Sequence, residues 1–293
     1  MASETVEIPV IWLAAQACSG CSVSLLNAAA PEVGTFLLEP FVPGRQLNLL
    51  FHMTIMAGQG EPVVKLLEDT ARDRKDGYIF VAEGSFPTKD KGLASTLGER
   101  NGAPVSMTDR AAELAANAMA VIGIGACASF GGIPAAAPDV TGARSVGQVM
   151  KDREIDKPLV NIPGCPPHPD WFTGTVAGIL LRGLPGPGDL DELGRPRAYF
   201  GKLIHESCPR RPDFDAAKFA KAFGDEGCLF QLGCKGPYTW ADCPTRMWNH
   251  GVNWCIGAGG PCAGCVEPEF PDAFSPLYKK LTEERLDRFA IRT

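Results

Sequence analysis

Residues 7–27, EIPVIWLAAQACSGCSVSLLN, decide the fold of the first part of the chain. The run EIPVIWL at 7–13 is short and apolar, which is typical of a buried strand. The loop after it carries Cys18 and Cys21, and SVSLLNAA then predicts the start of a helix. A strand, a loop and a helix in this order form one step of an α/β sheet, so both cysteines are expected just beyond the carboxyl end of a strand.

The same succession of buried strand and helix continues along the chain. Further strands are predicted at 47–53, 78–84, 118–125 and 158–162, and helices at 61–74, 108–118, 145–152 and 171–182. Strands that are apolar throughout and alternate with helices are typical of an open parallel sheet with helices on both faces. The fold class predicted for this part is therefore α/β.

Particular residues mark the ends of these helices. Pro62 lies in the first turn of its helix, and Thr108 and Asp170 are the expected N-caps of two others. Gly183 stops the helix that Asp170 begins. A final short helix is expected at 276–289.

The stretch LRGLPGPGDLDELGRPRAYF, residues 181–200, is rich in Gly, Pro and Asp, which predicts a linker. We therefore expect a sheet domain over residues 1–185 and a second domain over 186–293. Few apolar runs occur in the second domain, so an irregular structure is expected there, ordered by bound metal.

Four cysteines follow strands of the predicted sheet: Cys18, Cys21, Cys127 and Cys165. Parallel sheets bind ligands beyond the carboxyl ends of their strands, at the point where the strand order reverses. Three separate stretches of sequence therefore converge on one predicted four-ligand site.

Seven of the eleven cysteines lie in residues 204–266 and predict two further sites. One group is His205, Cys208, Cys228 and Cys234, and the other is Cys243, Cys255, Cys262 and Cys265. Four soft ligands suit a cubane iron–sulfur cluster or a tetrahedral zinc ion, and spacing alone leaves zinc open as the structural alternative. The three groups together use every cysteine, which favours metal sites over a disulfide framework, as does the odd number of cysteines.

Composition excludes several classes of partner. The formal charge of −6 and the pI near 5.3 argue against nucleic acid. No apolar run reaches the roughly 18 residues that a membrane span requires. The N-terminus carries no recognisable leader, so a soluble cytoplasmic protein is expected, or a periplasmic one exported by a leader or partner that this sequence does not contain.

The chain resembles the small, electron-transferring subunit of nickel–iron hydrogenases. The resemblance lies in CSGCSVSLLN (18–27), VAEGSFP (81–87), GACASFGGIPAA (125–136), NIPGCPPHPDW (161–171), IHESCP (204–209), LGCKGP (232–237), ADCP (241–244) and WNHGVNWCIGAGGPCAGCVEPEFPD (248–272). It implies a flavodoxin-like domain, followed by an irregular cluster-binding domain. It also implies an obligate heterodimer with a large subunit that holds the Ni–Fe site and splits hydrogen.

The resemblance further implies a role for each group. Cys18, Cys21, Cys127 and Cys165 would hold a proximal 4Fe-4S cluster, and His205, Cys208, Cys228 and Cys234 a distal one. Cys243, Cys262 and Cys265 would hold the medial cluster. Many members have proline where this chain has Cys255, and their medial cluster has three irons. A fourth thiolate predicts a complete medial 4Fe-4S cluster of lower potential, as in the selenium-containing branch; without Cys255 as ligand it would be 3Fe-4S.

Other features of the resemblance bear on partners. The C-terminal membrane helix of some members is missing, which favours a soluble redox partner such as a cytochrome or a ferredoxin. Glu83 is expected to face the partner subunit and the proximal cluster, or else to be an ordinary surface carboxylate. His52, His168 and His250 are interpreted as structural. Alternative functions are a regulatory hydrogen sensor, the related quinone-reductase subunit of respiratory complexes, and a zinc-stabilised scaffold.

Overall fold

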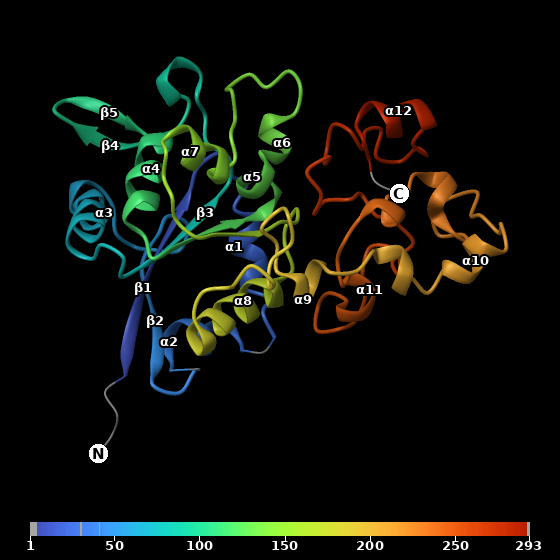
Figure 1. Ribbon diagram of the computed structural model, residues 1–293, viewed down its shortest axis with the longest axis horizontal. Helices are drawn as coiled ribbons and strands as arrows, with labels where there is room; N and C mark the ends of the chain where they lie inside the picture. The colour runs from blue at the N-terminus through green and yellow to red at the C-terminus, as the bar shows by residue number, and fades with distance from the viewer. Residues whose placement is uncertain (1–4, 30, 41, 292–293) are drawn as a thin grey trace. The chain divides into compact units, whose positions relative to one another are not determined.

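The computed structural model describes residues 5–29, 31–40 and 42–291, and its contacts divide the chain into two compact units, Met1–Gly194 and Arg195–Thr293 (Figure 1). Residues 186–194 belong to the first unit. Asn161 Nδ2 donates to the carbonyl oxygen of Leu193, and the backbone N–H of Asn161 donates to the carbonyl oxygen of Gly194. The assignment of a separate domain to residues 1–185 stays a prediction.

A five-stranded parallel sheet forms the centre of the first unit. Its strands are β1 (Val6–Ala14), β2 (Arg45–His52), β3 (Ile79–Glu83), β6 (Ala120–Ile124) and β7 (Leu159–Ile162). Their order in the sheet is β2-β1-β3-β6-β7, which is the flavodoxin-like order once the separate β4–β5 hairpin is left aside. Both the predicted α/β class and the flavodoxin-like topology are therefore confirmed.

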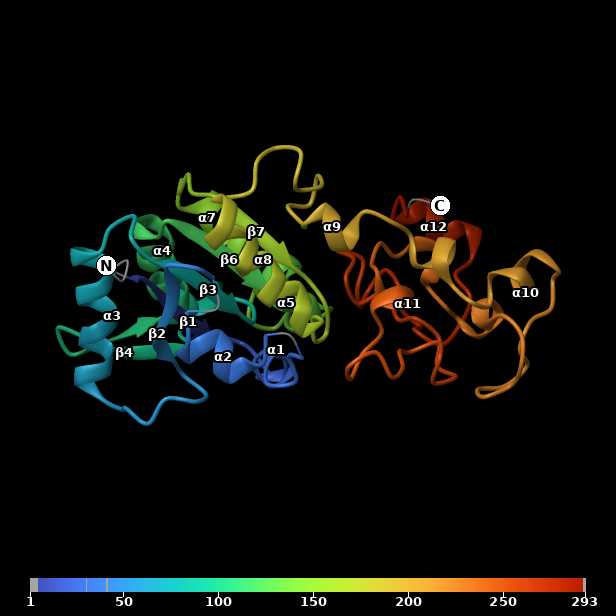
Figure 2. The same cartoon turned by 90° about the horizontal axis from the view of Figure 1, so that it is seen from below.

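Helices cover both faces of this sheet because successive strand residues point to opposite sides. Ile11 and Phe80 pack in the core with α3 (Glu61–Asp73), α4 (Met107–Asn117) and α7 (Val146–Asp152). Trp12 and Val81 point to the other face, towards α1 (Gly20–Leu25), α2 (Val33–Leu38) and α8 (Pro169–Arg182). Figures 1 and 2 show α4 on one side of the sheet and α2 on the other.

The helix ends agree only partly with the sequence. Pro62 lies in the first turn of α3 and Gly183 ends α8, as predicted. The N-cap of α4 is Ser106, whose Oγ accepts from the N–H of Asp109 at 3.0 Å, and the prediction of Thr108 is wrong. Thr108 instead donates its hydroxyl to Pro87 O at 2.5 Å.

The predicted N-cap of α8 is also wrong. His168 caps this helix, because its Nδ1 accepts from the N–H of Asp170 at 3.1 Å. Asp170 lies within the first turn, where its carboxylate still favours the positive end of the helix dipole.

Several short elements have no clear sequence signal. They are the antiparallel hairpin β4 (Thr96–Arg100) and β5 (Ala103–Ser106), and the helices α5 (Gly125–Phe130) and α6 (Gly132–Ala135). The buried guanidinium of Arg110 holds the hairpin to the helices through Leu97 O at 3.2 Å and Glu68 at 2.6 Å. The last predicted helix is shorter than expected, since α12 spans only Glu283–Arg288.

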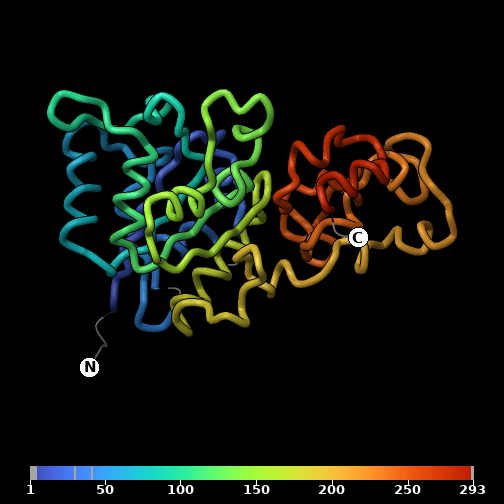
Figure 3. The backbone as a smooth tube through the Cα atoms, turned by 45° about the horizontal axis from the view of Figure 1, so that its top comes forward, coloured from blue at the N-terminus to red at the C-terminus, as the bar shows by residue number. Residues whose placement is uncertain are grey.

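The second unit is irregular (Figure 3). Its regular elements are α9 (Arg197–Phe200), η2 (Ile204–Ser207), α10 (Arg211–Asp215), η3 (Leu229–Leu232), η4 (Gly236–Tyr238), α11 (Cys243–Arg246) and α12. Within residues 195–291 the structure forms no strand beyond isolated bridges. The irregular second part is therefore as predicted.

Candidate metal centres

The proximal group lies at the carboxyl end of the parallel sheet. Cys18 and Cys21 follow β1, Cys127 is in α5 directly after β6, and Cys165 follows β7. Burial raises the pKa of Cys21, and Glu83, Cys127, Cys18 and Cys165 raise it further by charge repulsion. Groups that interact in this way are close in space, so the structure brings together the four cysteines that the sequence predicts.

Two glycines leave room for these thiols. A Cβ added at Gly125 would lie 2.5 Å from Cys21 Sγ, and one at Gly132 would lie 2.9 Å from Cys127 Sγ. Both glycines have positive φ, +86° and +54°, which side-chain-bearing residues rarely adopt. Larger residues at either position would displace a cysteine.

Glu83, at the end of β3, is enclosed beside this group. Its side chain is 1% exposed, and its Oε2 accepts from Trp12 Nε1 at 2.7 Å and from Ser22 Oγ at 2.5 Å. The alternative of a surface carboxylate is therefore wrong, and the charge of Glu83 acts on Cys21.

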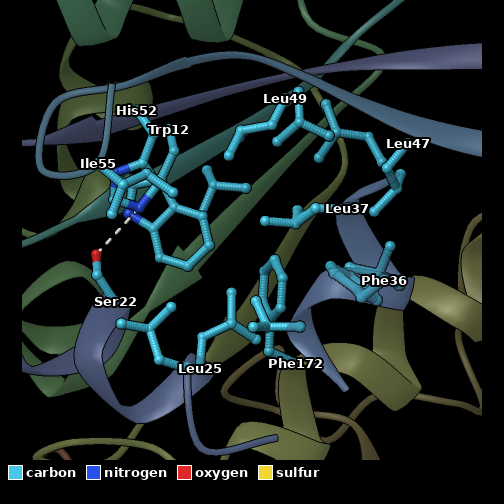
Figure 4. A pocket seen from close by; sticks show the side chains of 16 residues that line it. Trp12, Ser22, Leu25, Phe36, Leu37, Leu47, Leu49, His52, Ile55 and Phe172 are labelled. Carbon is cyan, nitrogen blue, oxygen red and sulfur yellow. Dashed lines mark hydrogen bonds between the residues drawn. The ribbon is translucent and has the colours of Figure 1, made fainter. Parts of the chain in front are cut away.

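The hydrogen bonds of Glu83 continue to His52. Ser22 Oγ lies 3.2 Å from His52 Nε2, and His52 Nδ1 accepts from the N–H of Thr54 at 3.2 Å. Burial lowers the pKa of His52, so the neutral ring carries its proton on Nε2. Figure 4 shows Ser22 and His52 at the edge of an apolar pocket that Trp12 and Phe172 also line. This histidine is structural, as the sequence suggests.

The distal group surrounds a single cavity. Its lining includes all four predicted ligands, His205, Cys208, Cys228 and Cys234. The three cysteines are buried and His205 is half-buried. Burial lowers the pKa of His205, which favours the neutral imidazole that binds metals.

The medial group is linked by the interactions of its thiols. Burial raises the pKa of Cys243 most, and Cys265 and Cys255 raise it further. The pKa of Cys262 is raised by burial, then by Cys234, Cys265 and Cys243. All four predicted ligands are therefore neighbours, and Cys262 also interacts with the distal group. Cys255 is exposed, whereas Cys262 is buried.

Each group has a backbone N–H that donates to a cysteine sulfur. The donors are Gly20 to Cys18 Sγ, Gly236 to Cys234 Sγ and Gly264 to Cys262 Sγ, each at 3.4 Å. Such bonds stabilise a thiolate over a thiol and are a means of tuning a cluster's potential. The pattern is visible in the sequence as Cys-x-Gly.

The ligands present fit iron–sulfur clusters. Thiolates, with one imidazole, are the usual protein ligands of such clusters, and the glycines leave space beside the sulfurs. Among residues 5–29, 31–40 and 42–291, no three His, Cys, Asp or Glu side chains are placed to hold a single metal ion.

Comparison with known proteins identifies the family. Residues 200–278 match the family model for the C-terminal part of the NiFe/NiFeSe hydrogenase small subunit. The small subunit of the periplasmic [NiFeSe] hydrogenase of Desulfomicrobium baculatum is 43% identical over 280 residues, covering 92% of this chain and 86% of the relative. The chain belongs to the nickel–iron hydrogenase small subunits.

Other relatives and solved structures agree. The F420 non-reducing hydrogenase II small subunit of Methanosarcina mazei is 40% identical, covering 94% of this chain and 77% of the relative. The crystal structure of a reduced, active Ni-Fe-Se hydrogenase from Desulfomicrobium baculatum matches with a TM-score of 0.87 and 42% identity, over 94% of this chain and all of that one. The predicted resemblance to the selenium-containing branch is thus confirmed.

This hydrogenase small subunit also matches a second family model. Residues 18–179 match the NADH ubiquinone oxidoreductase 20 kDa subunit, a stretch that contains the four proximal cysteines. The match at 200–278 adds most of the second unit, so the quinone-reductase alternative does not describe the whole chain. Hydrogenase small subunits transfer electrons and pair with a large subunit, and the comparisons do not favour a hydrogen sensor over this function.

The burial of three charged residues in the small subunit's second unit was not predicted from the sequence. They are Lys235, Arg195 and Glu267. Lys235 has no exposed surface, and its Nζ donates to Gly233 O at 2.6 Å, Lys279 O at 3.0 Å and Leu277 O at 3.3 Å. Burial lowers the pKa of Lys235 to about 8, against the opposing effect of the Cys234 and Cys262 thiolates.

A buried ion pair joins the other two, Arg195 and Glu267, at 3.0 Å. Glu267 follows Cys265 by two residues and also accepts from the N–H of Trp240 at 2.6 Å. Charged side chains usually lie at the surface, so nothing in the sequence marks these three as buried.

None of the helices formed by the described residues has the length and apolar character needed to cross a membrane.

Proposed function

We propose that this small subunit relays electrons through three 4Fe-4S clusters between the Ni–Fe site of its large subunit and an external one-electron acceptor. The observation that carries the proposal is the grouping of eleven cysteines and His205 into three sets of four, one of them around a single cavity. When bound, the clusters would supply one-electron redox chemistry. The chain's own residues would hold and tune them.

The proximal cluster would be held by Cys18, Cys21, Cys127 and Cys165. Cys18 and Cys165 are exposed, and Val23, Leu26 and Ile133 in and beside the neighbouring helices α1 and α6 expose 54–60% of their surfaces. An apolar surface next to exposed ligands suits a protein partner that keeps water from them. We propose this surface for the large subunit.

The distal cluster would be held by His205, Cys208, Cys228 and Cys234. A neutral imidazole in place of a thiolate makes this cluster less negative and should raise its potential, which favours electrons at the exit. A soluble acceptor such as a cytochrome or ferredoxin would receive them there.

The medial cluster would be held by Cys243, Cys255, Cys262 and Cys265 as a complete 4Fe-4S group. The interaction of Cys255 with Cys243 supports this assignment. Because Cys255 is exposed, one ligand of the medial cluster would be accessible to solvent in the small subunit without its partner.

We propose a periplasmic location for this protein, with the cytoplasm as the alternative. The relatives from Desulfomicrobium baculatum and Solidesulfovibrio fructosivorans are named periplasmic, which supports the periplasmic alternative over the cytoplasmic one. Fractionation of the source cells, with hydrogenase activity followed in each fraction, decides between them.

The function is tested on the complex with its large subunit. Under hydrogen, EPR spectra should show reduced iron–sulfur clusters, and an added one-electron dye should be reduced catalytically. A zinc-stabilised scaffold would give neither signal. Slow turnover together with a tightly bound signalling partner would instead favour the hydrogen sensor.

A further inference from the structure

Lys235 lies between the medial and distal groups. It follows Cys234 directly, and its backbone N–H donates to Cys262 O at 2.8 Å. Its Cβ also lies beside Gly264, between Cys262 and Cys265, since a Cβ added at Gly264 would be 3.3 Å from it. A single buried cation is therefore placed against both groups.

The surroundings of Lys235 suit an ammonium ion. A protonated lysine has three N–H donors, and three carbonyl oxygens accept from Nζ, those of Gly233, Leu277 and Lys279. A neutral amine would turn a lone pair towards one of these carbonyl oxygens, which repel it. The geometry therefore favours the charged form.

This charge has no acidic partner in the part of the chain that the structure describes. Among residues that the structure describes, no carboxylate lies within ion-pair distance of Lys235, although its side chain is wholly buried. Buried charges in proteins are paired or act on metal groups, because an uncompensated charge is costly away from water. Anionic clusters beside Cys234 and Cys262 would supply the missing negative charge.

We propose that Lys235 is a shared counter-charge for the medial and distal clusters, and that its ammonium raises the reduction potential of both. The inference rests on the proposed ligand sets. Reduction adds negative charge to a cluster, so a fixed positive charge nearby stabilises the reduced form. The fourth thiolate, Cys255, lowers the medial potential, and Lys235 offsets that effect.

Lys235 also joins two backbone segments, because its Nζ binds carbonyl oxygens at both 233 and 277–279. A purely structural role would predict loss of stability on substitution with unchanged potentials. The two roles therefore differ in what a redox titration reports.

The test uses Lys235→Met in the complete heterodimer, with medial and distal potentials measured by EPR-monitored titration. Both reduction potentials should fall by about 59 mV for one electron. At a fixed potential, the ratio of reduced to oxidised cluster should therefore be about tenfold lower. The matched control is Lys221→Met, which removes an exposed lysine of the same unit and should leave both potentials unchanged. Lys235→Gln, which keeps two donors without charge, should behave as Lys235→Met.

Unchanged potentials in either Lys235 variant with intact clusters would overturn the inference and leave the electron relay standing. Loss of both clusters in both variants would assign Lys235 to folding and also overturn it. A wild-type complex with zinc and no labile sulfide would instead refute the proposed function itself.

Discussion

The backbone N–H of Lys235 donates to the carbonyl oxygen of Cys262 at 2.8 Å, which joins the candidate distal group to the candidate medial group. Cys234 and Cys262 are also cysteines whose sulfurs accept from glycine N–H groups two residues later. A backbone hydrogen bond thus links the two groups. We expect changes at this bond to affect two clusters together.

Removal of the fourth medial ligand should change the cluster type. In Cys255→Ala, the iron content of the small subunit is expected to fall from about 12 to about 11, because a 3Fe-4S cluster needs only three thiolates. The medial potential should rise. Iron analysis and the EPR signal of an oxidised 3Fe-4S cluster measure this; a variant that keeps 12 irons would remove Cys255 from the ligand set.

Exchange of the imidazole for a thiolate should lower the distal potential. His205→Cys adds a negative charge at the cavity that His205, Cys208, Cys228 and Cys234 line. A redox titration of the purified complex gives the shift. An unchanged distal potential would count against histidine ligation.

Gly125 should tolerate no side chain. In Gly125→Ala the new Cβ would lie 2.5 Å from Cys21 Sγ, so the proximal cluster is expected to be lost, with about four fewer irons. Gly183→Ala is the matched control, because Gly183 has a similar φ of +88° but no atom within 4 Å of an added Cβ.

Gly183→Ala should lower the free energy of unfolding by about 1 kcal/mol, because alanine is strained at a positive φ. Its iron content should equal that of the unchanged protein. Iron content and thermal unfolding of both variants separate the two effects. Full iron content in Gly125→Ala would contradict the proposed proximal site.

Removal of the clusters should unfold the second unit before the first. The described residues of the second unit form no strand, and their helices span six residues or fewer, so bound clusters would supply much of the order. After anaerobic treatment with acid and chelator, limited proteolysis should cut within 195–291 while the parallel sheet persists. Equal resistance of both units would contradict this expectation.

The sheet was predictable because its signal is local. Residues 7–13 and 78–84 are largely apolar, and both contribute buried strands, β1 and β3. The capping residues were wrong by two positions, since Ser106 and His168 reach the helix N–H groups that Thr108 and Asp170 were expected to bind. Capping depends on the angle at which the chain enters the helix, which residue type alone does not determine.

The grouping of the cysteines was predictable for another reason. Their positions after strands and their number both limit how they can be combined, and the structure brings each predicted set together. The roles of Glu83 and Lys235 were not predictable. Both carry charges that usually face water, and their burial depends on contacts with residues far away in the sequence.

We propose that the three cysteine groups hold three complete 4Fe-4S clusters. The iron, acid-labile sulfide and zinc content of the anaerobically purified complex tests this proposal, after subtraction of iron in the large subunit's active site. About 12 irons and 12 sulfides per small subunit are expected. Zinc with little sulfide, in a preparation never exposed to air, would contradict it.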